Sequence, residues 1–351
     1  MTIGITGTGC YIPKVKKTNA SFSTHTFLQP DGTDFPNSNT VIIEKFKAIT
    51  GIEERRYVTD DLTTSDIATQ AAKEAIADAN IDKETLDYII FAHNFGDVKK
   101  GSHQGDQLPS LASKLKQKLQ IKNPKCVAYD MLFGCPGWVE GVIQAYAFIK
   151  SGMAKKCLVI GAETLSRVVD PNDRDSMIYA DGAGACIIEA NAAGNILSHA
   201  SETHAIEEAN YLFYGPSYNL SSTDTKYIKM HGRKIYEFAV TNVPKAIKSC
   251  IDESGIPISE IKKIFIHQAN EKMDEAIIKR VYKAYNLPVP EGIMPMSIGL
   301  LGNSSVATVP TLFHLVKTAQ LQGHHIVPGD VVVFASVGAG MNINAITYRF
   351  H

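Results

Sequence analysis

The sequence predicts an α/β fold with an internal duplication. Short β-branched runs alternate with amphipathic helical stretches along the 351 residues, a pattern typical of sheets covered by helices. Five of these runs are mostly apolar without alternation, as expected for strands buried on both faces. The candidate strands are 88–91, 157–160, 185–188, 263–266 and 331–334. Strands of this kind indicate sheets that lie between layers of helices.

Two pairs of segments repeat one helix–turn–strand pattern in the same order. The stretches 75–92 and 246–267 match each other, with the same spacing of apolar residues in the turn. The stretches after Cys135 and after Asn303 form a second matching pair, each leading into the next candidate strand. Two matches in register predict a duplicated fold whose halves pack together.

The duplication divides the chain into two predicted halves, 1–195 and 196–351. Three stretches fit neither copy of the repeat, namely 20–45, 95–110 and 201–232. They are rich in polar and turn-forming residues and are predicted to be loops or insertions. Substrate specificity commonly resides in such segments.

The composition is that of a globular protein, with 44% apolar and 20% charged residues. The formal net charge of -1 argues against a global attraction to nucleic acid or to an anionic membrane. The N-terminal residues read as a strand with no signal-peptide pattern, and no apolar stretch approaches the length of a membrane span. We therefore expect a cytoplasmic protein that binds neither nucleic acid nor membranes.

The six cysteines have no CxxC pair and no regular spacing. They are Cys10, Cys126, Cys135, Cys157, Cys186 and Cys250. In a reducing compartment they are expected to be free thiols and not a disulfide framework. No Cys/His cluster has ligand spacing, and the adjacent pair His324-His325 reads as a loop feature, so the sequence predicts no metal site.

Cys135 is the strongest candidate nucleophile. It lies where a strand-like run ends and a helix begins, with Pro136 suited to the first turn. A thiol at such a position faces unpaired N–H groups and the positive end of the helix dipole, which favour the thiolate. The alternative is that Cys135 is a small buried hydrophobic residue, as many free cysteines are.

Three later segments supply further candidates. The apolar strand 263–266 ends in His267, at the edge where open α/β sheets place ligands. Asn303 follows a glycine-rich turn and either points into a site or caps a helix. The turn at 338–340 either offers N–H groups to an oxyanion or only reverses the chain. A second Gly-x-Gly, at 7–9, is an equally weak indication of nucleotide binding.

Together these segments resemble the β-ketoacyl-ACP synthase III family of the thiolase-like fold. The resemblance covers nearly the whole chain. The segments that carry it are Cys135, His267-Gln268-Ala269-Asn270, Gly302-Asn303-Ser304-Ser305, Gly338-Ala339-Gly340, 50–56, 181–185 and 328–330. It implies duplicated βαβαβ halves that form a five-layered αβαβα core, and a homodimer.

The resemblance also implies a mechanism without metal or organic cofactor. Cys135 takes an acyl group from a thioester, and the N–H groups of Cys135 and Ala339 hold the oxyanion. His267 and Asn303 then hold the thioester carbonyl of malonyl-ACP while it loses carbon dioxide. The resulting carbanion attacks the acyl-Cys135 carbonyl in a decarboxylative Claisen condensation of fatty acid or related biosynthesis.

Substrate contacts are carried over residue by residue. The positions that match the family's contacts to CoA or to the pantetheine arm are Arg174, Tyr236, Ala269, Asn270 and Thr50. Lys45 and Ile49 replace a Trp and an Arg of the family, so the primer arrives either on CoA or on acyl carrier protein (ACP).

Two further surfaces are predicted from the resemblance. Leu108 replaces a Phe that crosses the dimer interface in many relatives and caps the acyl pocket. Either a longer acyl group enters there or the enlarged loop fills the space. Lys272, Lys279 and Arg280 form a basic helical face where acidic ACP is expected to dock, or a solvated face paired with nearby carboxylates.

Three other functions remain open at this point. The first is a specialised ketosynthase III-like acyltransferase of secondary metabolism. The second is a hydroxymethylglutaryl-CoA-synthase-like enzyme, which needs a glutamate base near the nucleophile; Glu140 lies on the following helix. The third is a non-catalytic subunit that binds an acyl carrier, although such proteins usually lose the active cysteine.

Overall fold

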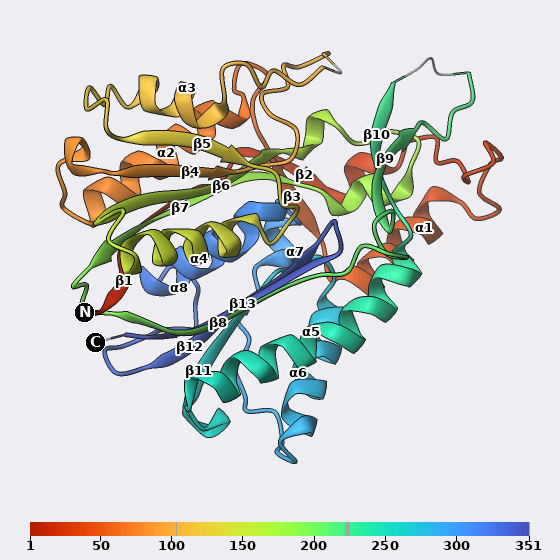
Figure 1. The fold of residues 1–351 in the computed structure, drawn as a ribbon. Coiled ribbons are helices and arrows are strands. Elements are labelled where there is room, and N and C mark those ends of the chain that lie inside the picture. Colours follow the sequence, from red (N-terminus) through yellow and green to blue (C-terminus); the bar gives the residue numbers. More distant parts are fainter. Residues whose placement is uncertain (103, 222–224, 351) are drawn as a thin grey trace.

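Two main sheets organise the computed structural model, which describes residues 1–102, 104–221 and 225–350 (Figure 1). The first sheet has the strand order β1-β7-β6-β4-β5 and the second the order β11-β12-β13-β8. The strands of the first sheet are β1 (Ile3–Tyr11), β4 (Tyr88–Ala92), β5 (Val127–Met131), β6 (Lys156–Thr164) and β7 (Asp181–Ala190). Those of the second are β8 (Asn195–Thr203), β11 (Ile261–Ile266), β12 (Val331–Gly338) and β13 (Asn342–Arg349).

Helices cover both sheets and fill the space between them. The long helices are α1 (Asn39–Thr50), α2 (Thr64–Asp78), α3 (Leu111–Lys118), α4 (Gly137–Lys150), α5 (Gly232–Ser254), α6 (Glu271–Ala284) and α8 (Thr308–Lys317), and α7 (Ile298–Leu301) is a single turn. Helices α2 and α3 cover the outer face of the first sheet, and α5 and α6 that of the second (Figure 1). Helices α4 and α8 lie between the sheets. The predicted αβαβα core is confirmed.

The strand pairings repeat in the two halves. In the first sheet β4 pairs parallel with β6, β6 antiparallel with β7, and β7 antiparallel with β1. In the second sheet β11, β12, β13 and β8 follow the same sequence of pairings. The five candidate strands all form, within β4, β6, β7, β11 and β12. The predicted division at residues 195 and 196 falls at the start of β8 and stays a prediction about folding units.

One difference between the halves is the outer neighbour of the parallel pair. In the first sheet β5 pairs with β4 along its length. In the second, the N–H of Ile264 on β11 donates to the carbonyl of Ile293, at 2.8 Å. The chain after α6 therefore lies beside β11 as β5 lies beside β4, but it does not form a continuous row of strand hydrogen bonds.

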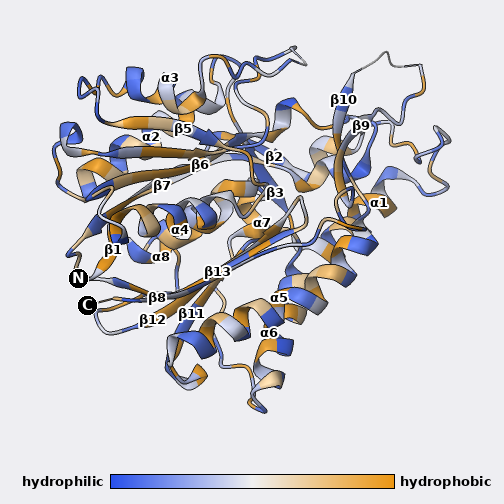
Figure 2. Ribbon diagram, in the orientation of Figure 1, coloured by the Kyte–Doolittle hydropathy of each residue, from blue (hydrophilic) through white to orange (hydrophobic). Residues whose placement is uncertain are grey.

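Apolar residues concentrate in the sheets and on the helix faces turned toward them (Figure 2). Between the sheets, the ring centroid of Phe334 on β12 lies 5.0 Å from that of Phe313 on α8 and 5.8 Å from that of Trp138 on α4. This packing holds α4 and α8 against both sheets. The turns that precede these two helices are thereby fixed relative to each other.

The segments predicted as loops contain regular structure. In 201–232, β9 (Leu212–Pro216) and β10 (Lys226–Met230) form a two-stranded sheet, so the loop prediction is wrong there. Residues 39–45 begin α1. A second small sheet joins β2 (Val15–Thr18) to β3 (Glu54–Tyr57). Among the described residues, no helix is both long and apolar enough to cross a membrane.

Candidate active site

Cys135 lies in the turn between β5 and α4 and lines a cavity of about 190 Å³. Gly134 before it has a φ of 70°, in the left-handed region that glycine adopts without steric cost. A Cβ at Gly134 would lie 2.9 Å from the backbone nitrogen of Ala339. The turn therefore needs glycine to bring Cys135 beside the end of β12.

The two predicted oxyanion-hole amides lie close together. A Cβ at Gly338 would stand 2.6 Å from the backbone nitrogen of Cys135, so the two chain segments are in direct contact. Within the described residues, the N–H groups of Cys135 and Ala339 donate to no other group. Two unpaired N–H groups beside a thiol can accept the negative charge of a tetrahedral intermediate.

His267 follows the last residue of β11 and is buried. Its backbone N–H donates to the carbonyl of Ala335, at 2.8 Å. Its Nδ1 lies 2.6 Å from Oγ1 of Thr308, the first residue of α8. Burial lowers the pKa of His267 to about 4, so the imidazole is neutral at pH 7. Since Nδ1 is held by Thr308, Nε2 is the nitrogen available for chemistry.

Asn303 is not the N-cap residue of a helix, because the 3-10 turn Ser305–Ala307 has Ser304 at that position and α8 begins only at Thr308. Its Oδ1 accepts a hydrogen bond from the N–H of Ser305, at 2.8 Å. No residue of the described chain pairs with its Nδ2, which is therefore a free donor. An amide fixed by its oxygen and free at its nitrogen can hold a carbonyl oxygen.

Ser305 connects these residues and was missed from the sequence. Its Oγ donates to the sulfur of Cys135 at 3.2 Å, and its N–H holds Asn303. The carbonyl of Ser305 accepts a hydrogen bond from Oγ1 of Thr308, at 2.7 Å. The same Oγ1 of Thr308 contacts Nδ1 of His267. The φ of Ser305 is 53°, a strained value for a residue with a side chain. The structure thus brings the three predicted catalytic residues together around one serine.

The resting state of Cys135 differs from the sequence-based expectation. Burial raises the pKa of the Cys135 thiol to about 11, against a smaller opposing effect of the Ser305 hydrogen bond. Hydrogen bonds at the helix start favour the thiolate, as expected, but burial outweighs them in the free enzyme. The proton must therefore leave the sulfur during acylation.

A second overlooked pair lies behind the thiol. Asn94 follows β4 and accepts from the N–H of Gly134, at 3.1 Å. Its own N–H and amide nitrogen both donate to Oε1 of Glu163, each at 2.6 Å. Burial raises the pKa of Glu163 to about 7. Glu140, the other carboxyl near the nucleophile in sequence, bonds to Ser201 and Asn344 and does not line the cavity.

The cavity at Cys135 is lined mainly by apolar and aromatic side chains. Its lining residues are Asn94, Phe95, Gly134, Cys135, Leu165, Tyr179, Leu212, Phe213, Tyr214, Ile228, Ser305 and Ala339. Four of these come from the hairpin β9–β10, so this insertion shapes the cavity. Leu108 does not line it; its side chain is 89% exposed in the single chain.

Most of the predicted substrate contacts line a second, larger cavity of about 780 Å³. Thr50, Arg174, Tyr236 and Asn270 all border it, and Ala269 does not. The two cavities adjoin, because Ile178 lines the larger and Tyr179 the smaller.

The polar groups in the larger cavity are only partly free. The Thr50 hydroxyl donates to the carbonyl of Phe46, at 2.8 Å. Asn270 caps α6, its side-chain oxygen accepting from the N–H of Met273 at 3.0 Å. The guanidinium of Arg174 lies 5.0 Å from the ring centroid of Phe35. Arg174 is thus held by an aromatic residue of the 20–45 segment, which sequence reasoning had not assigned.

Lys45 and Ile49, which replace the family's Trp and Arg, both line the same cavity from α1. Ile49 is half exposed there. Neither residue offers a planar stacking surface, although Lys45 retains a positive charge.

The predicted docking residues lie on α6 and are partly paired. Lys279 makes an ion pair with Glu275, at 3.4 Å, and Arg280 donates to the carbonyl of Val240. Lys272 is exposed and makes no ion pair to any described residue. Of the three basic residues on this face of α6, only Lys272 makes no ion pair or side-chain hydrogen bond with another described residue.

A duplicated five-layered fold with a thiol, a neutral imidazole, a free amide and two unpaired N–H groups defines a condensing enzyme of the thiolase-like class. The chain belongs to the β-ketoacyl-ACP synthase III family, and it is an acyltransferase. Family models described as 3-Oxoacyl-[acyl-carrier-protein (ACP)] synthase III and its C-terminal part match residues 129–205 and 251–350.

Relatives match over the full chain. A β-ketoacyl-ACP synthase III of Vibrio vulnificus is 32% identical, covering 99% of both chains. One of Erythrobacter litoralis is 30% identical, covering 99% of this chain and 98% of its own. Among solved structures, 3-oxoacyl-ACP synthase III of Aquifex aeolicus superposes with a TM-score of 0.81 at 29% identity, covering 99% of this chain and all of its own.

Proposed function

We propose that this enzyme joins an acyl group carried on Cys135 to the two-carbon unit of malonyl-ACP, with loss of carbon dioxide. The observation that carries the proposal is the placement of Cys135, His267 and Asn303 around Ser305. Ser305 contacts the thiol, holds Asn303 directly and holds His267 through Thr308, which fixes all three groups for successive steps at one carbonyl carbon.

The first step is acylation. The Cys135 sulfur attacks the thioester carbonyl, and its proton passes to Nε2 of His267, which is neutral and accepting. The N–H groups of Cys135 and Ala339 hold the oxyanion, each such donor contributing about 3 kcal/mol. The tetrahedral intermediate collapses, the carrier sulfur takes the proton from Nε2 of His267 and leaves as a thiol, and acyl-Cys135 remains.

The second step is condensation. The malonyl thioester carbonyl accepts hydrogen bonds from Nε2–H of His267 and from Nδ2 of Asn303. As the carboxylate leaves as carbon dioxide, its bonding electrons form an enolate. The enolate carbon attacks the acyl carbonyl, a carbon–carbon bond forms, and the Cys135 sulfur departs and regains a proton. For Nε2 to carry this proton the imidazole changes tautomer: Thr308 accepts from Nδ1–H during acylation, and in condensation its hydroxyl turns from the Ser305 carbonyl to donate to Nδ1.

The primer is a short apolar acyl group. The cavity of about 190 Å³ is somewhat larger than an apolar cavity of about 150 Å³ that binds benzene. Leu212, Phe213 and Tyr214 of the hairpin line this cavity and limit its volume. The sequence left open whether a longer acyl group enters beside Leu108 or an enlarged loop fills the acyl pocket. The small cavity favours a pocket that is filled by the protein's own residues.

We also propose where acyl carrier protein docks and that the enzyme is a homodimer. ACP, which is acidic in this class, would dock near Lys272 and the mouth of the larger cavity. A homodimer would bury Leu108, which is a large apolar side chain left in solvent in the single chain. The use of soluble carriers for both acyl groups supports the proposal of a cytoplasmic enzyme.

The test is acyl loading followed by intact mass. Purified protein is incubated with acyl-CoAs and acyl-ACPs from acetyl to dodecanoyl, beside a Cys135→Ala variant. We expect one acyl mass on the native protein, strongest for short chains, and none on the variant. A Phe213→Ala variant should extend loading to longer chains. Loading in the absence of Cys135, or no loading from any donor, would overturn the proposal.

A further inference from the structure

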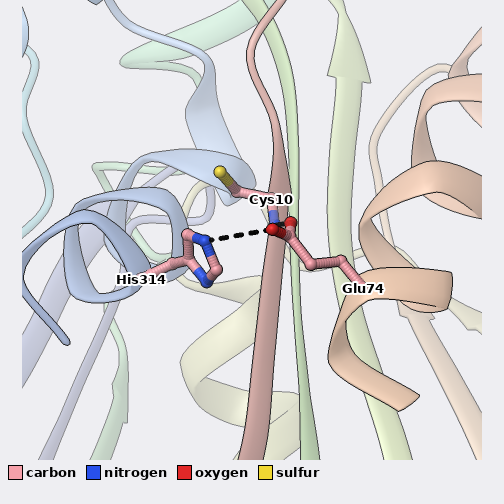
Figure 3. Close-up of side chains that lie close together, drawn as sticks. All are labelled: Cys10, Glu74 and His314. Carbon is pink, nitrogen blue, oxygen red and sulfur yellow. Dashed lines mark hydrogen bonds and ion pairs between the residues drawn. The ribbon is translucent and has the colours of Figure 1, made fainter. Parts of the chain in front are cut away.

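A second cluster of reactive side chains lies away from the active site, at the free edge of β1. It consists of Cys10 on β1, Glu74 on α2 and His314 on α8 (Figure 3). One potential ligand atom from each residue lies within 4.8 Å of the other two. His314 is 3% exposed, Cys10 is half-buried and Glu74 reaches solvent. The cluster is therefore buried at His314 and open to solvent at Glu74.

Close backbone packing brings these three elements together. A Cβ at Gly9 would lie 2.2 Å from the carbonyl oxygen of Ala71, so β1 and α2 touch through glycine. A Cβ at Gly184 on β7 would lie 2.6 Å from Pro310, so α8 also packs directly on the sheet. The Gly-x-Gly at 7–9, a weak indication of nucleotide binding in the sequence, is thus a packing feature.

The carboxylate of Glu74 is oriented toward the imidazole. Its Oε2 accepts from the N–H of Cys10 at 2.8 Å, a group on the free edge of the strand. This bond turns Oε1 toward Nε2 of His314, at 3.5 Å. The sulfur of Cys10 lies beside both atoms (Figure 3).

The other nitrogen of His314 is already engaged. Its Nδ1 lies 3.1 Å from Oγ1 of Thr8, and that hydroxyl donates to Oδ2 of Asp78, at 3.3 Å. Since the Thr8 proton points to Asp78, Thr8 accepts from Nδ1–H and leaves Nε2 with its lone pair. Hydrogen bonds that fix the ring in this way are typical around metal-binding histidines.

An imidazole lone pair, a carboxylate oxygen and a thiol that face one another leave room for a cation. Sulfur and imidazole ligands select zinc-like ions over Mg²⁺ or Ca²⁺.

We propose that Cys10, Glu74 and His314 bind one Zn²⁺ ion, with water as a fourth ligand. On binding, Cys10 loses its thiol proton to solvent. The sequence predicts no metal site because these ligands come from three distant segments and only the fold unites them. The ion would tie α2 to α8, the helix whose first residue, Thr308, holds His267.

Without a metal, the same contacts would only cover the edge of β1, as charged side chains often do at exposed strands. The two readings are separated by zinc binding. Metal-free protein is dialysed against buffered zinc, and bound metal is measured by mass spectrometry for the native chain and for Cys10→Ser and His314→Gln. Cys135→Ala, which removes another half-buried thiol, and the double variant of His324 and His325 serve as controls.

We expect one equivalent of zinc per chain in the native protein and in both controls. Both site variants should lose it, and Thr8→Val should weaken it by about 10- to 100-fold. Cobalt substitution should give a thiolate-to-metal absorption band that Cys10→Ser lacks, and circular dichroism checks that each variant is folded. No stoichiometric zinc, or equal zinc in folded Cys10→Ser and His314→Gln, would overturn the proposal and leave the edge-covering role.

Discussion

The hydroxyl of Ser305 donates a hydrogen bond to the sulfur of Cys135, at 3.2 Å, across 170 residues of sequence. The same residue holds Asn303 through its N–H and Thr308 through its carbonyl. The thiol, the amide and the imidazole are therefore coupled through one turn. Changes in that turn should alter each step in a distinguishable way.

Removing the Ser305 hydroxyl should slow deprotonation of the thiol. A hydrogen bond to a charged group contributes about 1.5 kcal/mol, which is roughly tenfold in thiolate population. We expect Ser305→Ala to be alkylated by iodoacetamide about tenfold more slowly at pH 8. Ser304→Ala is the matched control, because the Ser304 hydroxyl makes no hydrogen bond within the described chain. Equal rates for the native protein and Ser305→Ala would contradict this role.

Thr308 should act as a positioning residue for His267. Valine has nearly the same shape but cannot bond to Nδ1, so Thr308→Val should lower the rate of malonyl-ACP decarboxylation by about tenfold to a hundredfold. Thr308→Ser should restore most of it, and KM should change little. Thr311→Val, on the same helix and with only a 3.4 Å contact to the carbonyl of Ala183, is the control. A loss that serine does not rescue would indicate a packing role only.

The reactivity of Cys135 should increase steeply with pH. Because burial raises the pKa of this thiol to about 11, the thiolate fraction at pH 7 is small and grows tenfold per pH unit. We expect the alkylation rate of Cys135, followed by peptide mass, to rise from pH 7 to 10 without a plateau. A plateau below pH 8 would show that the helix dipole outweighs burial after all.

Asp274 on α6 should make stability depend on pH. It is fully buried, neither carboxyl oxygen has a hydrogen-bond partner, and burial raises its pKa well above the usual value. Because the pKa of Asp274 is higher in the folded than in the unfolded state, its contribution to the free energy of unfolding is complete below the unfolded-state pKa. This contribution is lost as the pH rises toward the folded-state pKa.

Asp274→Asn removes that titration. The free energy of unfolding of the variant, measured in urea, should match the native protein near pH 4 and exceed it increasingly toward pH 9. Asp34→Asn, at an exposed position, is the control for the loss of one carboxyl group. A constant difference between Asp274→Asn and the native protein across this range would contradict the assignment.

Local sequence patterns predicted the parts of this structure that depend on local chemistry. Buried strands such as 331–334 are apolar throughout, and the repeated spacing around them revealed the duplication. The turn around Cys135 was visible because glycine and proline mark its ends. By contrast, the segment with β9 and β10 was read as a loop or insertion, since each strand has only five residues and the flanking sequence is polar.

Long-range contacts were beyond the sequence. Ser305 and Thr308 look like ordinary residues at a helix start, and their roles follow from contacts with Cys135 and His267. Glu163 reads as one polar residue in an apolar strand, a signal that could have marked it as buried beside a site. The sequence indicates that the helix start favours the Cys135 thiolate, but it does not measure burial, which opposes this effect.

The central claim is that His267 and Asn303 stabilise the enolate while Cys135 holds the acyl group. The most direct measurement mixes pre-acylated enzyme with malonyl-ACP and follows carbon dioxide and the product on ACP by mass. We predict one carbon dioxide and one 3-oxoacyl-ACP per acyl-enzyme in the native protein. His267→Ala and Asn303→Ala should keep their acyl group and release almost no carbon dioxide. Transfer of the acyl group without carbon dioxide release, or full release by both variants, would contradict the account.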